Sequence, residues 1–349
     1  MEGTTLTDPT NPLDGFSITQ DDFDYVGTDL RRPECILAEP DGTLWSADAR
    51  GGVMRIAADG TQRLITQSTA LAGLTTDDAG SRLVDGTLPN GLAFDREGDF
   101  LVSNFGTDRL EHMTRDGRTT PIFETLDGGP IGKVNFVCRD SQDRVWVTVS
   151  TKAHDWRRQL TPEVEDGQLL VYADGKLRVV ADGLRFANEC KLDAAEEYIY
   201  VAQTCGRNIL RFRIQEDGSL ADREVYGPED HGRFIDGIAF DSFGNLWGTY
   251  IFTDGIFAIT PERDVRILFD DSTPEEIERF DRRFRAGTVD MDLMLSMGGP
   301  VATWCASVTF GGPDLRDVYV GSLRQTRLPH FRSPVAGLPL VHWSEMAGR

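Results

Sequence analysis

The sequence lacks the features that direct a chain to a membrane, to a nucleic acid or to an oxidising compartment. No apolar run approaches the roughly 18 to 20 residues needed to cross a bilayer, and the first residues, MEGTTLTDPTNPLDGFS, hold neither the basic nor the apolar part of a secretory signal. Lysine and arginine number only 36 against 57 aspartates and glutamates, and the resulting charge of −21 opposes binding to a phosphate backbone. We therefore expect a cytoplasmic protein without a nucleic-acid or membrane partner.

Cysteine is too sparse and too scattered to organise the fold. The five cysteines are odd in number and form no CxxC pair, which suggests neither a disulfide framework nor a thiolate zinc site. An HExxH sequence, a glycine-rich phosphate loop and a Ser/His/Asp triad signature are also missing. Helical periodicity is almost absent, which excludes Rossmann and TIM-barrel architectures.

A sixfold repeat takes the place of these features. Each unit runs from a polar residue through a short apolar stretch and an Asp/Gly-rich turn into a strand with a large residue, as in ECILAEPDGTLWSAD and NGLAFDREGDFLVSN. The large residues recur every 45 to 72 positions and are Trp45, Leu101, Trp146, Tyr200, Trp247 and Tyr319. This period is typical of propeller blades. The sequence therefore predicts an all-β, six-bladed β-propeller with four-stranded blades, forming a single domain over residues 1–349.

Two segments fall outside the repeat. After Tyr319 only one further good strand is predicted, around residues 337–343, so we expect the N-terminal segment at about 22–28 to supply the missing outer strand and close the last blade. Residues 273–286 predict one short helix, with Thr273 as N-cap and Glu276 completing a capping box. This helix belongs to an insertion over residues 270–303, which is expected to lie over the active-site face.

The opening position of each repeat, 11 or 12 residues before the large residue, is always polar. Inner strands of a propeller line its central channel, so these side chains are expected to converge at one height. They are Glu34, Asn90, Asn135, Asn188, Asp236 and Ser307. Such hard oxygen donors suit Ca²⁺, Mg²⁺ or Mn²⁺. The alternative is that they are polar because the channel is wet, or because they serve the turn that enters each strand.

Several motifs carry a family resemblance. They are Pro-Glu-Cys at 33–35, Asn188 at the start of the fourth repeat, IDGIAFD at 235–241 and FGGPDLRDVYV at 310–320. Together they resemble the senescence-marker-protein, gluconolactonase and luciferin-regenerating-enzyme family, six-bladed propellers that include regucalcin. The resemblance extends from Pro33 to Trp343.

The resemblance implies that Glu34, Asn188 and Asp236 hold one divalent metal ion, with Asn135 either as a fourth ligand or in contact with substrate. It also implies that Asp236 is the catalytic base. Asn90, Lys133 and Asn104 are further candidates for binding the substrate. The chain departs from the family pattern, because Phe136 follows Asn135 and Lys133 stands where an arginine is common. These departures question the familiar sugar-lactone substrate more than the metal site.

The predicted function is hydrolysis of a small-molecule lactone that depends on a divalent metal, with Ca²⁺ expected first and Mg²⁺, Mn²⁺ or Zn²⁺ as other possibilities. The metal would polarise the carbonyl and activate water while Asp236 takes the proton, unless His231 or His154 serves as base. Two alternatives stay open, a phosphotriesterase-like hydrolase on the same metal site and a calcium-binding or ligand-binding propeller without turnover. The sequence does not indicate an oligomeric state.

Loops after the second strand of each blade are expected to surround the site. Two of them contain basic stretches, residues 151–160 and 323–335, which favour a substrate or product that carries a carboxylate; the alternative is ordinary solvated charge. The Met-rich stretch 291–299 could form an apolar wall over the pocket. Individual candidates for pocket lining are Phe105, Trp156, Phe252, Trp304 and Phe331.

Overall fold

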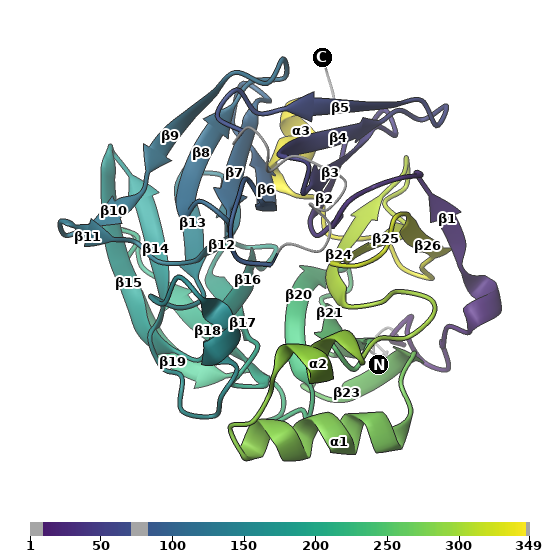
Figure 1. Cartoon of the computed structure of the whole chain (residues 1–349). Helices are drawn as coiled ribbons and strands as arrows, with labels where there is room; N and C mark the ends of the chain where they lie inside the picture. Colours follow the sequence, from purple (N-terminus) through teal and green to yellow (C-terminus); the bar gives the residue numbers. More distant parts are fainter. Residues whose placement is uncertain (1–9, 71–82, 347–349) are drawn as a thin grey trace, which may run out of the picture.

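Six antiparallel sheets of four strands surround a central channel in the computed structural model, which describes residues 10–70 and 83–346 (Figure 1). In each blade the first strand of the repeat is the inner one, and these six strands contact their neighbours around the channel. The inner strands are β2 (Ile36–Ala38), β6 (Pro89–Phe94), β12 (Val134–Arg139), β16 (Ala187–Leu192), β20 (Phe234–Phe240) and β24 (Cys305–Gly311). The predicted all-β, six-bladed propeller with four-stranded blades is confirmed.

The remaining strands follow outward from the channel in each blade. The second strands are β3 (Leu44–Asp48), β7 (Phe100–Asn104), β13 (Val145–Val149), β17 (Tyr198–Gln203), β21 (Leu246–Ile251) and β25 (Asp317–Ser322). The third strands are β4 (Gly52–Ile56), β8 (Arg109–Met113), β14 (Gly167–Ala173), β18 (Asn208–Ile214), β22 (Gly255–Ile259) and β26 (Leu328–Arg332). The outer strands are β5 (Gln62–Thr66), β9 (Thr119–Phe123), β15 (Lys176–Leu184), β19 (Leu220–Val225), β23 (Val265–Asp270) and β1 (Asp24–Val26), and β10 (Thr125–Leu126) pairs with β11 (Gly129–Pro130) as a separate hairpin.

In the third and fifth blades the large residue of the repeat is a tryptophan, and the preceding turn supplies a partner for its polar atom. Trp146 and Trp247 are fully buried, and their indole N–H groups donate to Asp140 Oδ2 and Asp241 Oδ2, each at 2.9 Å. The same carboxylates accept backbone N–H groups within their own turns, as Asp241 does from Asn245. The Asp-rich turn and the aromatic residue therefore form one unit, which explains why the two recur together in the sequence.

The sixth blade contains strands from both ends of the chain. Strand β1 pairs antiparallel with β26, with Asp24 opposite His330 and Val26 opposite Leu328. The predicted strand at 337–343 is wrong, because the third strand of this blade is β26, earlier in the sequence. Residues 341–346 instead form the helix α3 (Val341–Met346).

The C-terminal segment is apolar because it covers the end of the channel opposite the predicted ring. Leu338 N donates to Phe240 O at 2.9 Å, at the last residue of β20, and His342 Nε2 donates to Ala38 O at 2.9 Å, at the last residue of β2. Glu345 pairs with the buried guanidinium of Arg139, at the last residue of β12. These contacts join α3 and the residues before it to three blades.

The insertion between the fifth and sixth blades forms two helices, α1 (Pro274–Arg285) and α2 (Met291–Leu295), which lie side by side in Figure 1. The capping box of Thr273 and Glu276 begins α1 as predicted. The helices α2 and α3 were not predicted. Both are too short to show a clear helical period. Within the described ranges no helix combines the length and the apolar character that crossing a membrane would require.

Candidate functional site

The predicted ring residues lie where the inner strands begin, and the strand pairing is irregular at these positions. The ladder between inner and second strand shifts register around Asn90, Asn135, Asn188, Asp236 and Ser307. Such bulges re-aim side chains that a regular ladder would place alternately on the two faces. Glu34 precedes the first residue of β2 and is free of the ladder for that reason.

Five of the six residues line one pocket at the channel mouth, with about 400 Å³ of empty space including its open end. They are Glu34, Asn90, Asn135, Asn188 and Asp236. Ser307 does not line it, because its hydroxyl donates to the carbonyl oxygen of Glu34 at 2.5 Å. The predicted ring is therefore five residues around a pocket, and the sixth fixes the backbone of Glu34.

Two hydroxyl groups, each on the residue that directly follows the second strand of its blade, fix the orientation of two ring amides. Ser150 and Thr204 donate their only hydroxyl protons to Ala187 O and Ile235 O, at 2.8 and 2.7 Å. Each hydroxyl oxygen can then only accept a further hydrogen bond. Ser150 Oγ accepts one from Asn135 Nδ2 at 2.9 Å, and Thr204 Oγ1 accepts one from Asn188 Nδ2 at 3.1 Å. Both amides are consequently turned so that Oδ1 points away from these hydroxyls.

Three oxygens at the pocket are buried and have no hydrogen-bond partner among the described residues. They are Glu34 Oε2, Asn188 Oδ1 and Asp236 Oδ1. Asn135 Oδ1 differs, because it accepts Asn90 Nδ2 at 3.2 Å. Leaving three buried acceptors unpaired costs free energy, whereas a divalent cation prefers carboxylate and amide oxygens of this kind. The donor set therefore fits a hard metal ion.

The pKa shifts of the two pocket carboxylates also favour a cation at this place. Burial raises the pKa of Glu34 to about 8, although the Arg32 guanidinium opposes the shift. Burial also raises the pKa of Asp236 well above its ordinary value, and the nearby Glu34 carboxylate adds to this effect. A second positive charge at this place would stabilise the ionised form of both carboxylates.

Arg32 is a pocket residue that the sequence analysis missed. Its guanidinium is buried and donates to Asn90 Oδ1 at 2.6 Å and to Pro89 O at 3.2 Å. The backbone of Arg32 is left-handed, with φ of +53°, which directs the chain back toward Glu34. Its position two residues before the opening Glu34 was the available signal.

The wall above these polar groups consists of apolar side chains. Phe105, Trp156 and Phe252 line the pocket and were among the candidates named from the sequence, while Phe186 was not. The candidates Trp304 and Phe331 do not line it, because Trp304 packs behind Phe252 at 5.1 Å between ring centroids and Phe331 packs in the sixth blade. Leu160, Ile251 and Leu323 complete the wall.

A family model described as the SMP-30/gluconolactonase/LRE-like region matches residues 33–324. The chain belongs to this family. It is 26% identical over 165 residues to a 6-deoxy-6-sulfogluconolactonase of Pseudomonas putida, and the match spans 46% of this chain and 46% of that relative, so about half of each length is compared.

Solved structures share the fold of this SMP-30/gluconolactonase/LRE-like protein. A gluconolactonase from Xanthomonas campestris superposes with a TM-score of 0.60 at 17% identity, over 88% of this chain and 97% of that one. A calcium-binding protein, regucalcin, from Agrobacterium tumefaciens superposes with a TM-score of 0.63 at 14% identity, over 90% and 95%. At such identities the superpositions establish the fold alone.

The structure of this family member does not bring Lys133 and Asn104 to the pocket. Lys133 Nζ contacts Asp108 Oδ1 and Phe105 O, both at 3.0 Å, and Val84 O at 3.2 Å. Asn104 is fully buried and donates to Glu111 Oε2 at 2.9 Å. Both side chains hold loops around the pocket, so their predicted contact with substrate has no support in the geometry.

The two histidines considered as bases also lie outside the pocket lining. His154 bridges Asp108 and Asp85, with contacts of 2.6 and 2.8 Å. His231 Nδ1 contacts the Tyr250 hydroxyl at 2.9 Å, and burial lowers its pKa to about 4. Among the described residues that line the pocket, the groups able to accept a proton are thus the carboxylates of Glu34 and Asp236.

The basic stretches 151–160 and 323–335 contribute no lysine or arginine side chain to the pocket lining. Residues 328–332 form β26 rather than a loop, and Arg332 pairs there with Asp314 and Asp317. The Met-rich stretch contributes buried Met294 and Met297 to the hydrophobic cluster behind the pocket wall, and neither side chain lines the pocket itself.

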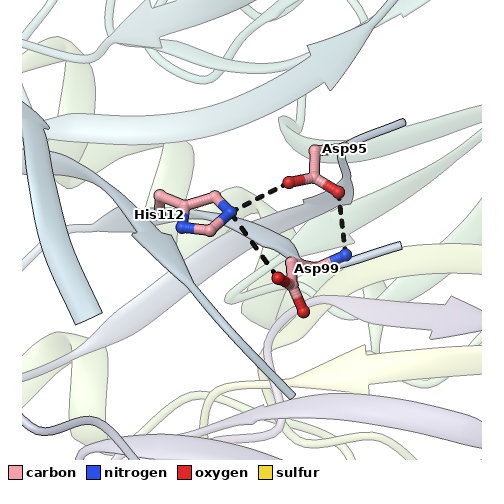
Figure 2. A group of neighbouring side chains, drawn as sticks. All are labelled: Asp95, Asp99 and His112. Atoms are coloured by element: carbon pink, nitrogen blue, oxygen red, sulfur yellow. Dashed lines mark hydrogen bonds and ion pairs between the residues drawn. The ribbon is translucent and has the colours of Figure 1, made fainter. Parts of the chain in front are cut away.

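A separate group of possible metal ligands lies at the opposite end of the second blade (Figure 2). His112 Nε2 is 2.9 Å from Asp95 Oδ2 and 3.9 Å from Asp99 Oδ2. Asp95 occupies the turn position whose carboxylate binds an indole N–H in the third and fifth blades, but the second blade has Leu101 in place of tryptophan. The carboxylate binds His112 instead, so the group has a structural explanation and no connection to the ring.

Proposed function

We propose that the chain is a metal-dependent hydrolase that opens a lactone ring. The observation that carries the proposal is the set of three unpartnered buried oxygens, on Glu34, Asn188 and Asp236, around one pocket. Membership of a gluconolactonase family and similarity to a sulfogluconolactonase support the choice of a lactone as substrate.

Glu34, Asn188 and Asp236 would hold the metal, and Asn135 Oδ1 could join them if its contact with Asn90 opens. The oxygen-only donor set favours Ca²⁺, with Mg²⁺, Mn²⁺ and Zn²⁺ as other candidates. A divalent ion bound here would polarise the lactone carbonyl and lower the pKa of water.

Asp236 is proposed as the catalytic base. Each pocket carboxylate has one oxygen without a partner in the described chain, Glu34 Oε2 and Asp236 Oδ1, and these oxygens would face the metal. The other oxygen of Glu34 accepts Asn90 Nδ2 at 2.8 Å, so the second oxygen of Asp236 is the one proposed to take a proton from the attacking water. Asn90 and Arg32 hold Glu34 in place and keep a positive charge beside the two carboxylates.

Asp236→Asn tests this function, because asparagine keeps the size and one metal-ligating oxygen but cannot accept the proton. We expect the metal-loaded variant to hydrolyse lactones at least 10³-fold more slowly than wild type. The matched control is Asp217→Asn, the same change in an exposed turn. A wild-type protein that binds Ca²⁺ but turns over no lactone would instead indicate a calcium-binding propeller, and hydrolysis of phosphotriesters alone would indicate the related esterase activity.

A further inference from the structure

The geometry points to a specific substrate class: a lactone whose ring carries an apolar substituent, rather than a polyhydroxylated or charged sugar lactone. This inference rests on the proposed function, which supplies the lactone. It is carried by the division of the pocket into a polar floor, in which nearly every donor atom already bonds to the protein, and a wall that presents only carbon.

Most donor atoms of the floor already make a hydrogen bond to a protein group. The amide nitrogens of Asn90, Asn135 and Asn188 donate to Glu34, Ser150 and Thr204. The Thr204 hydroxyl donates to a backbone carbonyl, and both terminal nitrogens of Arg32 are bonded to the second blade. Among the described lining residues, Arg32 Nε is the one buried nitrogen without any partner, so nearly all donor atoms of the floor are already directed at protein groups.

The wall adds no polar group to this floor. Trp156 is the one wall residue with a polar side-chain atom, and its indole N–H donates to Leu83 O, so the ring presents carbon to the pocket. Phe105 and Phe186 flank it with centroids 6.1 and 6.0 Å away. Sugar hydroxyls placed against these rings would lose their hydrogen bonds to water without replacement.

The wall is also rigid, because the helical insertion supports it from behind. Phe252 stacks on Phe280 of α1 with centroids 4.9 Å apart and an angle of 16° between the rings. Phe186 and Phe252 hold left-handed backbones with φ of +58° and +68°, a conformation that is costly for bulky side chains. The surrounding structure therefore holds the apolar wall in place even without a ligand.

Charged sugar lactones fit no better. Apart from Arg32, whose terminal nitrogens are bonded, the described lining residues include no cation. Arg324 and Arg327, which belong to the basic stretch 323–335, lie over the rings of Trp304 and Tyr25 instead. A sulfonate or carboxylate on the substrate would thus enter the pocket without a partner.

The first test compares δ-lactones of equal ring size on the metal-loaded full chain. Alkyl lactones from δ-hexalactone to δ-octalactone should gain about fourfold in kcat/KM for each added methylene. Glucono-δ-lactone should be slower than δ-octalactone by at least about 100-fold. Equal or faster hydrolysis of gluconolactone would overturn the inference and leave the proposed function intact.

The second test needs no turnover. Calorimetry should detect binding of a propyl-substituted δ-lactam, a stable analogue, about tenfold or more tighter than binding of the unsubstituted δ-lactam, both without metal and with Ca²⁺. If no lactone is hydrolysed but the propyl preference persists, the proposed function fails while the apolar pocket stands. Equal binding of the two lactams would overturn the inference.

Phe186→Asn places an amide in the wall at a left-handed position that asparagine tolerates. The ratio of kcat/KM between δ-octalactone and δ-valerolactone should fall at least fivefold in this variant. The matched control is Phe243→Asn, in the turn between β20 and β21, where the ratio should stay at the wild-type value. An unchanged ratio in a folded Phe186→Asn protein would contradict the assignment of Phe186 to the substrate wall.

Discussion

His342 in α3 allows the closure of the far channel end to be tested quantitatively. Its Nε2–H donates to Ala38 O at 2.9 Å, and its ring meets Phe94 at a centroid distance of 4.9 Å. Burial lowers the pKa of this histidine from 6.5 to about 4, so the folded chain holds it neutral. The hydrogen bond needs only the neutral form, because the carbonyl oxygen accepts the single ring proton.

The direction of the pH effect follows from the lowered pKa. Below pH 6.5 the unfolded chain takes up a proton at His342 that the folded chain refuses until about pH 4. Stability is therefore present above pH 6.5 and is lost as the pH falls, by about 1.4 kcal/mol for each pH unit. Over the whole interval the loss attributable to this side chain is about 3 kcal/mol, as an upper value.

His342→Gln isolates this contribution, because glutamine can donate to Ala38 O but does not titrate. We would measure the free energy of unfolding by urea for both proteins between pH 7 and pH 4.5. The difference in unfolding free energy between wild type and variant should shrink as the pH falls. The contributions of the other titrating groups, including His231, are the same in both proteins and cancel in this difference. A difference that stays constant across this range would refute the burial and neutrality of His342.

Three further predictions concern the ring and the blades. Saturating Ca²⁺ at 100 times its dissociation constant should stabilise the wild type by about 2.7 kcal/mol, and Glu34→Gln should lose most of this gain, as seen in the melting temperature with and without EDTA. Thr204→Val should let the Asn188 amide rotate and weaken metal affinity, measured by calorimetry, about 10-fold to 100-fold. The control Thr43→Val should keep the wild-type affinity. Equal affinities of the two variants would contradict the orienting role of Thr204. Asp140→Ala should destabilise the fold by about 2 to 4 kcal/mol in urea, because it leaves the Trp146 N–H and the buried Arg144 without their acceptor; a loss below 1 kcal/mol would contradict this.

The blade count and the ring could be predicted because each depends on a local pattern that recurs. The turn carboxylate and the buried tryptophan are six residues apart in the third and fifth blades, so a single sequence reveals both. The opening residues stand at a nearly constant distance from the same large residue. Because both patterns recur from blade to blade, they could be recognised in the sequence, which one blade alone would not have allowed.

Features that occur once could not be predicted in this way. Phe186 and Arg32 both stand two residues before a ring residue and reach the pocket through left-handed backbones, but the residue type at this position changes from blade to blade and so gives no periodic signal. The apolar run before α3 has the composition of a strand, but its partners are the ends of inner strands about 100 or more residues away. Lys133 stands at the expected sequence position, and its direction is decided by the distant Asp108 and the carbonyl of Phe105.

Hydrogen bonds from side chains to backbone carbonyls join the six blades at the height of the ring, although the donor residue differs between blades. In every blade a side chain donates to a backbone carbonyl near the start of the next blade's inner strand, at the ring residue or directly before it. The donors and acceptors are Arg32 to Pro89, Asn90 to Asn135, Ser150 to Ala187, Thr204 to Ile235, Thr249 to Ala306 and Ser307 to Glu34. The circle of contacts closes on Glu34 itself.

This circle explains how unpaired oxygens can be kept at the centre of the fold. Each contact directs a side-chain donor at the backbone of the neighbouring blade. The oxygens of Glu34, Asn188 and Asp236 are left without a partner beside these engaged donors. Turning one of these donors toward such an oxygen would break a contact between two blades. The unfavourable arrangement is therefore maintained by the closure of the propeller, and a cation entering from the channel mouth would find its ligands already in position.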